Sequence, residues 1–474
     1  RGGRRAVDMT RTHRLVLSGV LTPDQTQTYP LLPFDVPPHA ERIEVSYRYA
    51  GAIGSDPHLT GGNTVDIGIF DSRGASFNSE GFRGWSGSAR SEFYLATTEA
   101  TPGYMPGPLP AGTWNICLGA YKVADAGCVV EVTIVITEGD GQTVAEFPQR
   151  LPLSNAPRPD VRQADGWYRG ELHCHTVHSD GDSDPADVVR RAEALGLDFL
   201  AIMDHNVQSQ QAALATVETP LMLIPGTEVT TYRGHWNTWG AGPWIDFRVL
   251  TEADMQAAVD MALAAGYLIS CNHPKPFGPE WAYPEVAGFH CIEVWNGPWP
   301  AANDVALAYW DGKLRAGARI TAVGGSDCHF HKTEHPAKLG NPTTFIHCEG
   351  APSPAALLVN LRAGHAFISE APDGPELVLS AGGVLMGDSI RPEGATAAFT
   401  IHTRRAQGKT LQIVTAEGIV YRSPVTEAEW QRTIEVRVAE TPYVRAVLVS
   451  GSAEDLHVHA ISNPVYIESA SHQN

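Results

Sequence analysis

Histidine and carboxylate side chains gather in the middle of the chain, in a spacing that suits metal binding. Of the 19 histidines, 12 lie between His173 and His365. His173 and His175 are two residues apart, so on a strand both imidazoles would point to one face and could reach the same ion. Nine candidate ligands follow one another in short motifs: His173, His175, Asp180, His205, Glu228, His235, His273, Asp327 and His329.

This set of side chains predicts a centre with more than one metal ion. Mixed imidazole and carboxylate ligands suit Zn²⁺, Mn²⁺ or Fe²⁺. Because the candidates outnumber what one tetrahedral ion needs, we expect two or three divalent transition-metal ions. Such ions generate a hydroxide near neutral pH, which would attack a phosphorus atom or a carbonyl carbon. The predicted chemistry is hydrolysis.

Several side chains next to the ligands are candidates for acting on the substrate. The expected catalytic residues are Asp327, His329 and Glu228, and a hydrogen bond from Asp327 or His329 would orient the nucleophile. Basic side chains would hold an anionic group and tryptophans would form an aromatic wall. The expected substrate contacts are Arg233, Trp239, Lys275, Asn296, Trp299 and Lys332.

Some of these residues also have simpler interpretations. Asp180 precedes Gly181 and could close a turn. Asp204 is expected to support a metal-bound histidine and not to bind metal itself. His235 is expected in a short loop, where neighbouring aromatic residues could pack it. Tryptophans more often belong to a core than to a substrate wall.

The elements that would position the ligands alternate between strand and helix. Apolar runs predict buried strands over 198–203, 221–224, 267–270, 291–295 and 320–323, and helical patterns predict helices over 185–195, 253–265 and 304–316. Alternating strands and helices form parallel βα units, in an open sheet or in a barrel. In both, chemistry belongs at the carboxyl ends of the strands, where the candidate ligands lie.

The two flanking parts of the chain have all-β patterns. Alternation over 43–49 and 65–70 and a β-branched run over 129–136 predict strands, separated by glycine and proline clusters. We therefore expect an N-terminal β-sandwich or jelly roll over 1–150, a proline-rich linker over 151–166 and a small C-terminal β-sandwich over 375–474. The metallohydrolase part would occupy 167–374.

Composition limits the partners. Lys and Arg number 34 against 53 Asp and Glu, a formal charge of −19 that disfavours general nucleic-acid binding. It does not exclude a small anionic substrate, because bound cations reverse the local sign. No apolar run has the length of a membrane span. Seven cysteines without compact spacing predict reduced thiols and a cytoplasmic location, although Cys117 and Cys128 could pair across a hairpin. A homo-oligomer is compatible with this composition.

The ligand motifs resemble the PHP (polymerase and histidinol phosphatase) superfamily. The matching residues are His173-x-His175-Thr176, Ser179-Asp180-Gly181, Asp204-His205, Glu228, His235, Asn272-His273-Pro274 and Ser326-Asp327-x-His329. The resemblance implies a distorted (β/α)7 barrel with two or three metal ions at its mouth. It further implies three ligand sets: His173, His175, Glu228 and Asp327 for one ion; Asp180, His205 and His329 for a second; Glu228, His235 and His273 for a third.

The wider layout is similar to a narrower branch, the CehA/McbA-type metallohydrolases, named for carbaryl-hydrolysing enzymes. The cues are a β domain carrying Phe82-Arg83-Gly84-Trp85-Ser86-Gly87, the run Glu293-Val294-Trp295-Asn296-Gly297 and the terminal Ile461-Ser462-Asn463-Pro464.

Three functions remain in competition at this point. The basic residues favour a phosphoesterase acting on small mono- or diesters. The tryptophans and the branch resemblance favour a hydrolase of carboxylic or carbamate esters. A catalytically silent metal- or carbohydrate-binding module is the third, but a structural metal site needs far fewer ligands than this chain offers.

Overall fold

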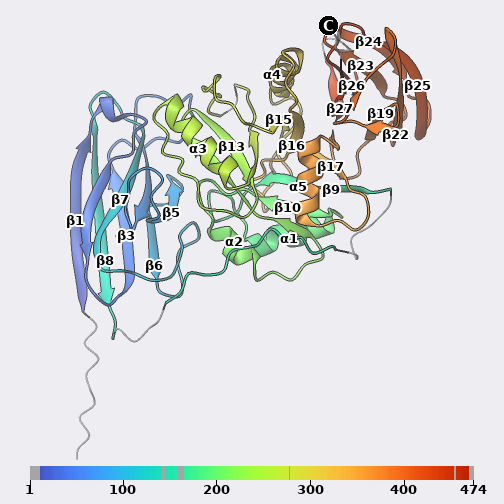
Figure 1. Cartoon of the computed structure of the whole chain (residues 1–474). Coiled ribbons are helices and arrows are strands. Elements are labelled where there is room, and N and C mark those ends of the chain that lie inside the picture. Colours follow the sequence, from blue (N-terminus) through green and yellow to red (C-terminus); the bar gives the residue numbers. More distant parts are fainter. Residues whose placement is uncertain (1–10, 141–144, 159–164, 277, 453–454, 469–474) are drawn as a thin grey trace, which may run out of the picture.

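The computed structural model describes residues 11–140, 145–158, 165–276, 278–452 and 455–468. Three strand-rich parts follow one another along the molecule, with the N-terminal part at the left of Figure 1 and the C-terminal part at the upper right. The metal-ligand candidates belong to the middle part, which contacts both neighbours.

The N-terminal part is a β-sandwich of two four-stranded sheets. Its core alternates with the pleat: on β8, every second residue from Cys128 to Ile136 is buried. The expected strands over 43–49, 65–70 and 129–136 are confirmed within β3, β4 and β8. One sheet has the order β1 (Thr12–Leu21), β8 (Cys128–Glu138), β3 (Ala40–Tyr49), β6 (Glu92–Ala96); the other has β2 (Leu31–Val36), β7 (Gly112–Lys122), β4 (Thr64–Phe70), β5 (Phe82–Gly87).

The middle part contains two groups of strands. In the first, β9 (Trp167–Cys174), β10 (Phe199–Ile202) and β11 (Met222–Ile224) are parallel, and β17 (Thr343–His347) and β18 (Ala366–Ser369) continue the sheet on the other side of β9. The second group has the order β12 (Gly226–Thr231), β13 (Gly234–Trp239), β14 (Leu268–Cys271), β15 (Cys291–Asn296), β16 (Thr321–Gly325). Two isolated parallel bridges, Cys174–Cys328 and His205–Glu228, connect the groups.

The expected distorted (β/α)7 barrel does not appear as a closed, clean barrel, because the middle part is a mixed, strand-dominated assembly. β12 and β13 form an antiparallel hairpin, and the two residues between them leave no room for a helix. Between the two groups of strands, isolated bridges stand in place of a continuous run of paired residues. The helices are α1 (Pro185–Ala194), α2 (Ser209–Leu214), α3 (Glu252–Ala264), α4 (Asn303–Arg315) and α5 (Pro354–Ala363).

The C-terminal strands share a sheet with the metal-ligand region. β18 pairs with β27 (His457–Ser462), so one eleven-stranded sheet continues through β26 (Tyr443–Ser450), β23 (Thr410–Thr415) and β24 (Gly418–Pro424). The side chain of Asn463 bonds the backbone of Ala322 on β16 and of Ala366 on β18. The remaining strands are β19 (Glu376–Ala381), β20 (Val384–Leu385), β21 (Ser389–Ile390), β22 (Thr396–Arg404), β25 (Glu429–Arg437) and β28 (Val465–Ile467).

The N-terminal sandwich is fixed against the middle part by a shared core and buried polar contacts. Phe70 and Trp85 of the sandwich pack with Phe247 in one apolar cluster. The buried Arg248 guanidinium donates to the carbonyl oxygens of Ala75 at 2.8 Å and Ser76 at 3.0 Å. Arg248 also pairs with Asp246 of the middle part, and separating the two parts would leave its remaining N–H groups without these acceptors.

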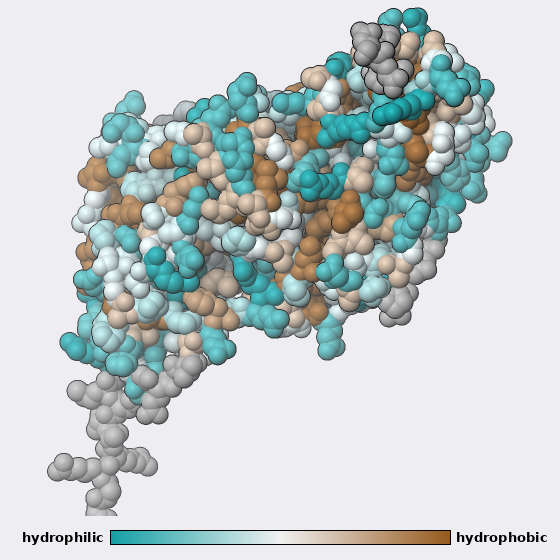
Figure 2. Space-filling view, viewed as in Figure 1, coloured by the Kyte–Doolittle hydropathy of each residue, from teal (hydrophilic) through white to brown (hydrophobic). Residues whose placement is uncertain are grey.

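The surface carries separate hydrophobic patches on the face shown in Figure 2. On β1 and β8, Val16, Val20 and Val129 are each more than half exposed, at 53%, 60% and 58%. Among the described residues, no helix combines the length and apolar character required to cross a membrane. All seven cysteines are buried free thiols, so the Cys117–Cys128 pairing is not formed.

Candidate metal centre

The candidate ligands lie at the ends of strands from both halves of the middle part. His173 is the next-to-last residue of β9, and His175 follows that strand directly. His205 lies after β10, Glu228 lies on β12 and His273 lies two residues after β14. Asp327 and His329 follow β16. The sequence was wrong about His235, which lies on β13 opposite Thr230 and not in a loop.

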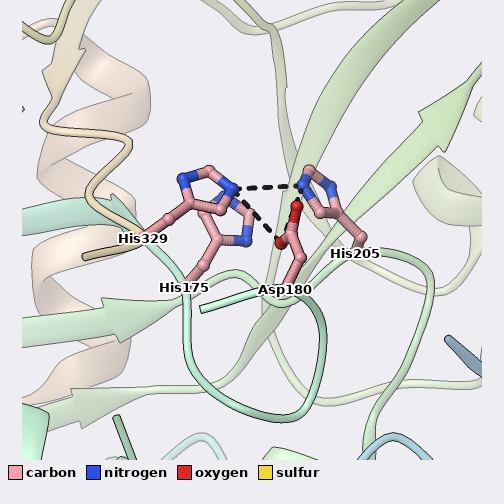
Figure 3. A group of neighbouring side chains, drawn as sticks. All are labelled: His175, Asp180, His205 and His329. Carbon is pink, nitrogen blue, oxygen red and sulfur yellow. Dashed lines mark hydrogen bonds and ion pairs between the residues drawn. The ribbon is translucent and has the colours of Figure 1, made fainter. Parts of the chain in front are cut away.

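Four of these side chains point toward one another in Figure 3. The Asp180 carboxylate faces two imidazoles, with Oδ1 at 3.3 Å from Nε2 of His329 and 3.6 Å from Nε2 of His205. The ring of His175 stacks at 4.0 Å from that of His329. The potential ligand atoms of all four residues lie within 4.8 Å of one another, close enough for one ion to reach them together.

Glu228 lies at the middle of the remaining candidates and is fully buried. Its Oε2 is 3.4 Å from Nε2 of His173 and 2.8 Å from Nδ1 of His205. Its Oε1 is 3.4 Å from Nδ1 of His235 and 3.5 Å from Nε2 of His273. Each of the two Glu228 carboxylate oxygens therefore lies near two imidazoles, as expected of a ligand that bridges two ions.

Asp327 completes the set of nine. Its Oδ1 is 3.0 Å from Nε2 of His175 and 3.4 Å from Nε2 of His173. Three ligand groups result within the described residues, and each pair of groups shares one member: His175, Asp180, His205 and His329; His173, His175 and Glu228; His205, Glu228 and His235. A separate group shares no residue with these: Glu370, directly after β18, with His457 and His459 on β27.

The chemistry of the donors fits divalent cations. Oε2 of Glu228 and Oδ1 of Asp327 are buried and have no hydrogen-bond partner, although a buried carboxylate oxygen normally has one. Nε2 of His173 faces Nε2 of His175 at 3.1 Å, so two ring nitrogens converge on the same space. A cation between these two oxygens and two nitrogens would give each of the four atoms a partner. Packing of the side chains alone would leave the two oxygens without one.

Two carboxylates and His175 have the protonation states of ligands, whereas nearby carboxylates outweigh burial and raise the pKa of His173 and of His329, whose protons a bound cation would displace. Burial alone would raise the pKa of Glu228 and of Asp327, but the imidazole of His173 outweighs it and holds both pKa values well below the usual range. Burial, with His329 and His205 nearby, lowers the pKa of His175 to about 4. At neutral pH the carboxylates are ionised and the His175 ring is neutral, as metal coordination requires.

A buried carboxylate that the sequence analysis did not identify as part of the site holds one ligand in place. Nδ1 of His173 donates to Oε1 of Glu293 at 2.9 Å. Asn296 connects Glu293 to the ligands, since its Nδ2 donates to Oε2 of Glu293 at 3.1 Å and to Oδ2 of Asp327 at 3.2 Å. The available signal was a charged residue inside the apolar strand 291–295.

Asp204 acts on a loop and not directly on a histidine. Its Oδ1 accepts from the backbone N–H of Thr176 at 2.8 Å and from the Ser179 hydroxyl at 2.7 Å. That hydroxyl lies 3.5 Å from Nδ1 of His175. Asp204 therefore fixes the turn that carries Asp180 and supports His175 through Ser179.

The backbone is strained at two ligands and crowded at a third. His273 and Asp327 have positive φ angles of 29° and 50°, which are unfavourable for residues with a Cβ and concentrate at functional sites. At Gly325, an added Cβ would lie 2.4 Å from Cβ of His173 and 2.7 Å from Oε1 of Glu293. Only glycine allows β16 to approach the His173–Glu293 pair so closely.

The expected substrate contacts are not gathered around one space. Nζ of the buried Lys275 donates to the Asn296 carbonyl at 2.8 Å, and burial lowers the pKa of this lysine to about 8. Trp239 is buried in the core, where its Nε1 donates to the Leu172 carbonyl at 3.1 Å. Trp299 is also buried and packs edge-on against Trp295, with centroids 4.9 Å apart.

The two remaining basic residues are exposed. Arg233 lies 5.7 Å from the centroid of the Tyr283 ring. Nζ of Lys332 donates to the Asp182 carbonyl at 2.7 Å. The cavity next to the ligands has a volume of about 630 Å³ and is lined by Asp180, His205 and His235, but by none of the six expected substrate contacts.

Comparisons with known proteins give limited similarity. No protein-family model matches the chain. A segment of 63 residues is 40% identical to a 5'-3' exoribonuclease of Haemophilus influenzae and covers 13% of this chain. The chain thus spans 23% of the length of that relative.

Among solved structures, a two-domain protein of Bacteroides vulgatus containing a predicted PHP-like metal-dependent phosphoesterase aligns over 64% of this chain and 94% of its own, with 17% identity and a TM-score of 0.35. A proposed metal-dependent phosphoesterase of Bifidobacterium adolescentis covers 40% and 94%, with 19% identity and a TM-score of 0.29. An amidohydrolase of Chromobacterium violaceum covers 43% and 97%, with 16% identity and a TM-score of 0.27. All three TM-scores are below 0.5, so function is inferred from the site itself.

Proposed function

We propose that the chain is a metal-dependent phosphoesterase of the PHP type that hydrolyses small phosphomono- or diesters. The observation that carries the proposal is the set of three overlapping ligand groups, in which each pair of groups shares His175, His205 or Glu228. Such sharing brings several cations close together. A phosphoryl group presents several charged oxygens to such a cluster, whereas a carbonyl presents one.

The residues would divide among two or three ions of Zn, Mn or Fe. His173, His175, Glu228 and Asp327 surround one position, and Asp180, His205 and His329 surround a second. Glu228 would extend to a third with His235 and His273. When bound, these cations supply a hydroxide nucleophile at neutral pH and offset the negative charge on the phosphoryl oxygens.

Side chains of the protein itself would orient the nucleophile. Asp327 presents Oδ1 toward His175, while its Oδ2 is fixed by the Asn296 amide. Nδ1 of His329 donates to the Asp327 carbonyl at 2.9 Å, which turns Nε2 toward Asp180. Both side chains are partly exposed, at 24% and 20%, as are Asp180 at 46% and His205 at 19%, so these four are the ligands most open to a substrate. Asp327 and His329 would orient the nucleophile.

Hydrolysis of carboxylic or carbamate esters, as in the CehA/McbA branch, is the second candidate. It is favoured by the position of Arg233, Lys275 and Lys332, none of which lines the cavity beside the ligands. A neutral ester needs no cationic side chain. The catalytically silent binding module is disfavoured, because nine converging ligands exceed the needs of a structural site.

Metal analysis with a substrate panel tests the proposal. The purified full chain is expected to contain two or more metal ions and to cleave p-nitrophenyl phosphate or bis-p-nitrophenyl phosphate in a chelator-sensitive way. Cleavage of 1-naphthyl N-methylcarbamate alone would favour the second candidate. No metal, and no turnover after Mn²⁺ or Zn²⁺ is added, would contradict both.

A further inference from the structure

The cavity beside the metal ligands has its opposite wall on the N-terminal sandwich. Asp180, His205 and His235 line one side of this space of about 630 Å³. The other side is lined by sandwich residues from four different strands and a connecting segment: Tyr29, Tyr49, Asp66, Trp85 and Tyr121. A molecule held at the metal centre would therefore extend toward the sandwich.

This wall is preformed and is not a mobile cover. The Tyr232 hydroxyl on the metal-binding side donates to Oδ2 of Asp66 on the sandwich at 2.7 Å. The backbone N–H of Asn78 donates to Oδ2 of the buried Asp246 at 2.9 Å. Trp85 packs 4.7 Å from Phe247, centroid to centroid. These contacts fix the position of the wall relative to the metal ligands.

Aromatic rings make up much of the wall. The Tyr232 ring is stacked between Tyr29, at 5.3 Å, and Tyr121, at 4.8 Å. Trp85 is tilted by 58° against Tyr29, and Tyr49 lines the same space. Grouped aromatic rings are a common recognition surface for organic cations, which favour electron-rich ring faces.

The carboxylates at the sandwich end of the cavity are Asp56 and Asp66. No Lys or Arg is found among the described residues that line the cavity. Asp66 is only 8% exposed, and burial raises its pKa to about 7 because no cation offsets the desolvation. A bound cation would supply the missing partner.

Two neighbouring features preserve this arrangement. Nζ of Lys122, the residue after Tyr121, is turned away to the carbonyl oxygens of Gly54, at 3.2 Å, and Asp56. At Gly119, an added Cβ would come within 2.1 Å of the Tyr232 hydroxyl and 3.0 Å of Cβ of Asp66. Glycine at this position leaves room for the Asp66–Tyr232 pair.

We propose that the sandwich wall around Asp66, Trp85 and Tyr121 binds a compact organic cation, and that the substrate is a phosphoester whose alcohol carries a methylated ammonium group. The proposal rests on the proposed phosphoesterase function. The metal centre takes the anionic end of the substrate and the wall takes the cationic end. In the reaction, water adds to phosphorus, the bond between phosphorus and the ester oxygen breaks, and the amino alcohol leaves with a proton.

The first test measures binding without catalysis. Choline and its uncharged isostere 3,3-dimethylbutan-1-ol are titrated into the full chain by calorimetry. Choline is expected to bind at least about tenfold more tightly, because cation–aromatic and carboxylate contacts both require the charge. Equal binding of the two alcohols, or no binding of choline, would overturn the cation site.

Variants locate the site. Asp66→Asn and Tyr121→Leu are each expected to weaken choline binding about tenfold or more. Asp35→Asn is the matched control, because it removes the same charge from an exposed position on β2 outside the cavity. Thermal unfolding of each variant checks that the fold is kept. Unchanged choline affinity in both cavity variants would contradict the assignment.

The second test separates this site from the proposed function. Phosphate release is measured from phosphocholine and from 3,3-dimethylbutyl phosphate. Faster cleavage of phosphocholine than of the uncharged ester, with this preference lost in Asp66→Asn, supports both the phosphoesterase function and the cation site. Equal cleavage of the two esters keeps the phosphoesterase and overturns the cation site. Cleavage of neither, together with choline binding that depends on Asp66, overturns the phosphoesterase and keeps the cation site.

Discussion

Glu293 and His173 form a buried hydrogen-bonded pair, with Oε1 of Glu293 2.9 Å from Nδ1 of His173. The bond leaves Nε2 of His173 free to face Glu228 and Asp327. Carboxylates that hold the second nitrogen of a metal-ligating histidine fix its tautomer and raise its basicity. Glu293 is thus a positioning residue for the centre, although it is not itself among the nine candidate ligands.

Replacing this positioning residue is expected to weaken metal binding. Glu293→Gln keeps the size of the side chain but removes its charge, so metal affinity should fall about 10- to 100-fold. Elemental analysis after dialysis against graded metal concentrations measures the change. Glu417→Gln, on an exposed turn, is the control. If metal affinity is unchanged in Glu293→Gln, the pair has only a structural role.

Glu228→Gln is expected to reduce metal content and not only turnover. Glu228 belongs to two of the three overlapping ligand groups, so losing one anionic oxygen affects more than one cation position. We expect at least one metal ion fewer per chain and a loss of activity of at least about 100-fold. The measurement is metal stoichiometry beside phosphate release. Full metal content in this variant would contradict a bridging role for Glu228.

Gly325→Ala is expected to damage the centre through packing alone. The added Cβ would lie 2.4 Å from Cβ of His173, so β16 or the histidine must move. Overpacking of this kind costs about 1–3 kcal/mol, and metal content should fall with it. Gly312→Ala is the matched control on α4, where an added Cβ meets nothing within 4 Å. That variant should be neutral or stabilised by about 0.5–1 kcal/mol.

The pH dependence of stability should carry a contribution from Asp66. Burial raises its pKa in the folded protein to about 7, while the unfolded value is near 3.8. The folded state therefore binds this proton more tightly, so the contribution to stability is full below about pH 4 and is lost as the pH rises through about 7. The groups that interact with Asp66 are the hydroxyls of Ser88 and of nearby tyrosines, whose pKa values are raised, so they stay neutral in this range: Tyr29, Tyr47, Tyr49, Tyr121 and Tyr232.

Urea unfolding of the full chain and of Asp66→Asn at pH 5 and pH 8 measures this contribution. At about 1.4 kcal/mol per pKa unit, the upper bound on the loss is about 4 kcal/mol. The Asn variant should therefore gain stability relative to the original chain as the pH rises. A constant difference between the two proteins across this range would show that Asp66 does not titrate there.

The ligand set could be predicted from sequence because its members lie in short motifs at strand ends. His173 and His175 share a strand face, and the turns after β10 and β16 carry His205 and Asp327, so local patterns were sufficient. The hairpin of β12 and β13 was missed because apolar and polar residues do not alternate along it, and both of its strands are buried.

Side-chain direction and long-range packing could not be predicted in the same way. Lys275 follows His273 by two residues, yet its Nζ points to Asn296 and Asn303 because their oxygens fill a buried site. Trp239 ends β13 facing the core. The aromatic wall of the cavity comes from Tyr29, Trp85 and Tyr121, which are far from the ligands in sequence and reach them only through the docking of the sandwich.

The eleven-stranded sheet connects the strands that carry candidate metal ligands and the C-terminal strands by continuous hydrogen bonding. Because β18 pairs with β27 and Asn463 holds β16, the C-terminal part cannot be cut off without exposing an open strand edge beside the metal centre. The two parts should therefore unfold cooperatively, as one thermodynamic unit. An exchange of the C-terminal strands between proteins would have to preserve this strand pairing, whereas the N-terminal sandwich is joined by side-chain packing and hydrogen bonds without a shared sheet.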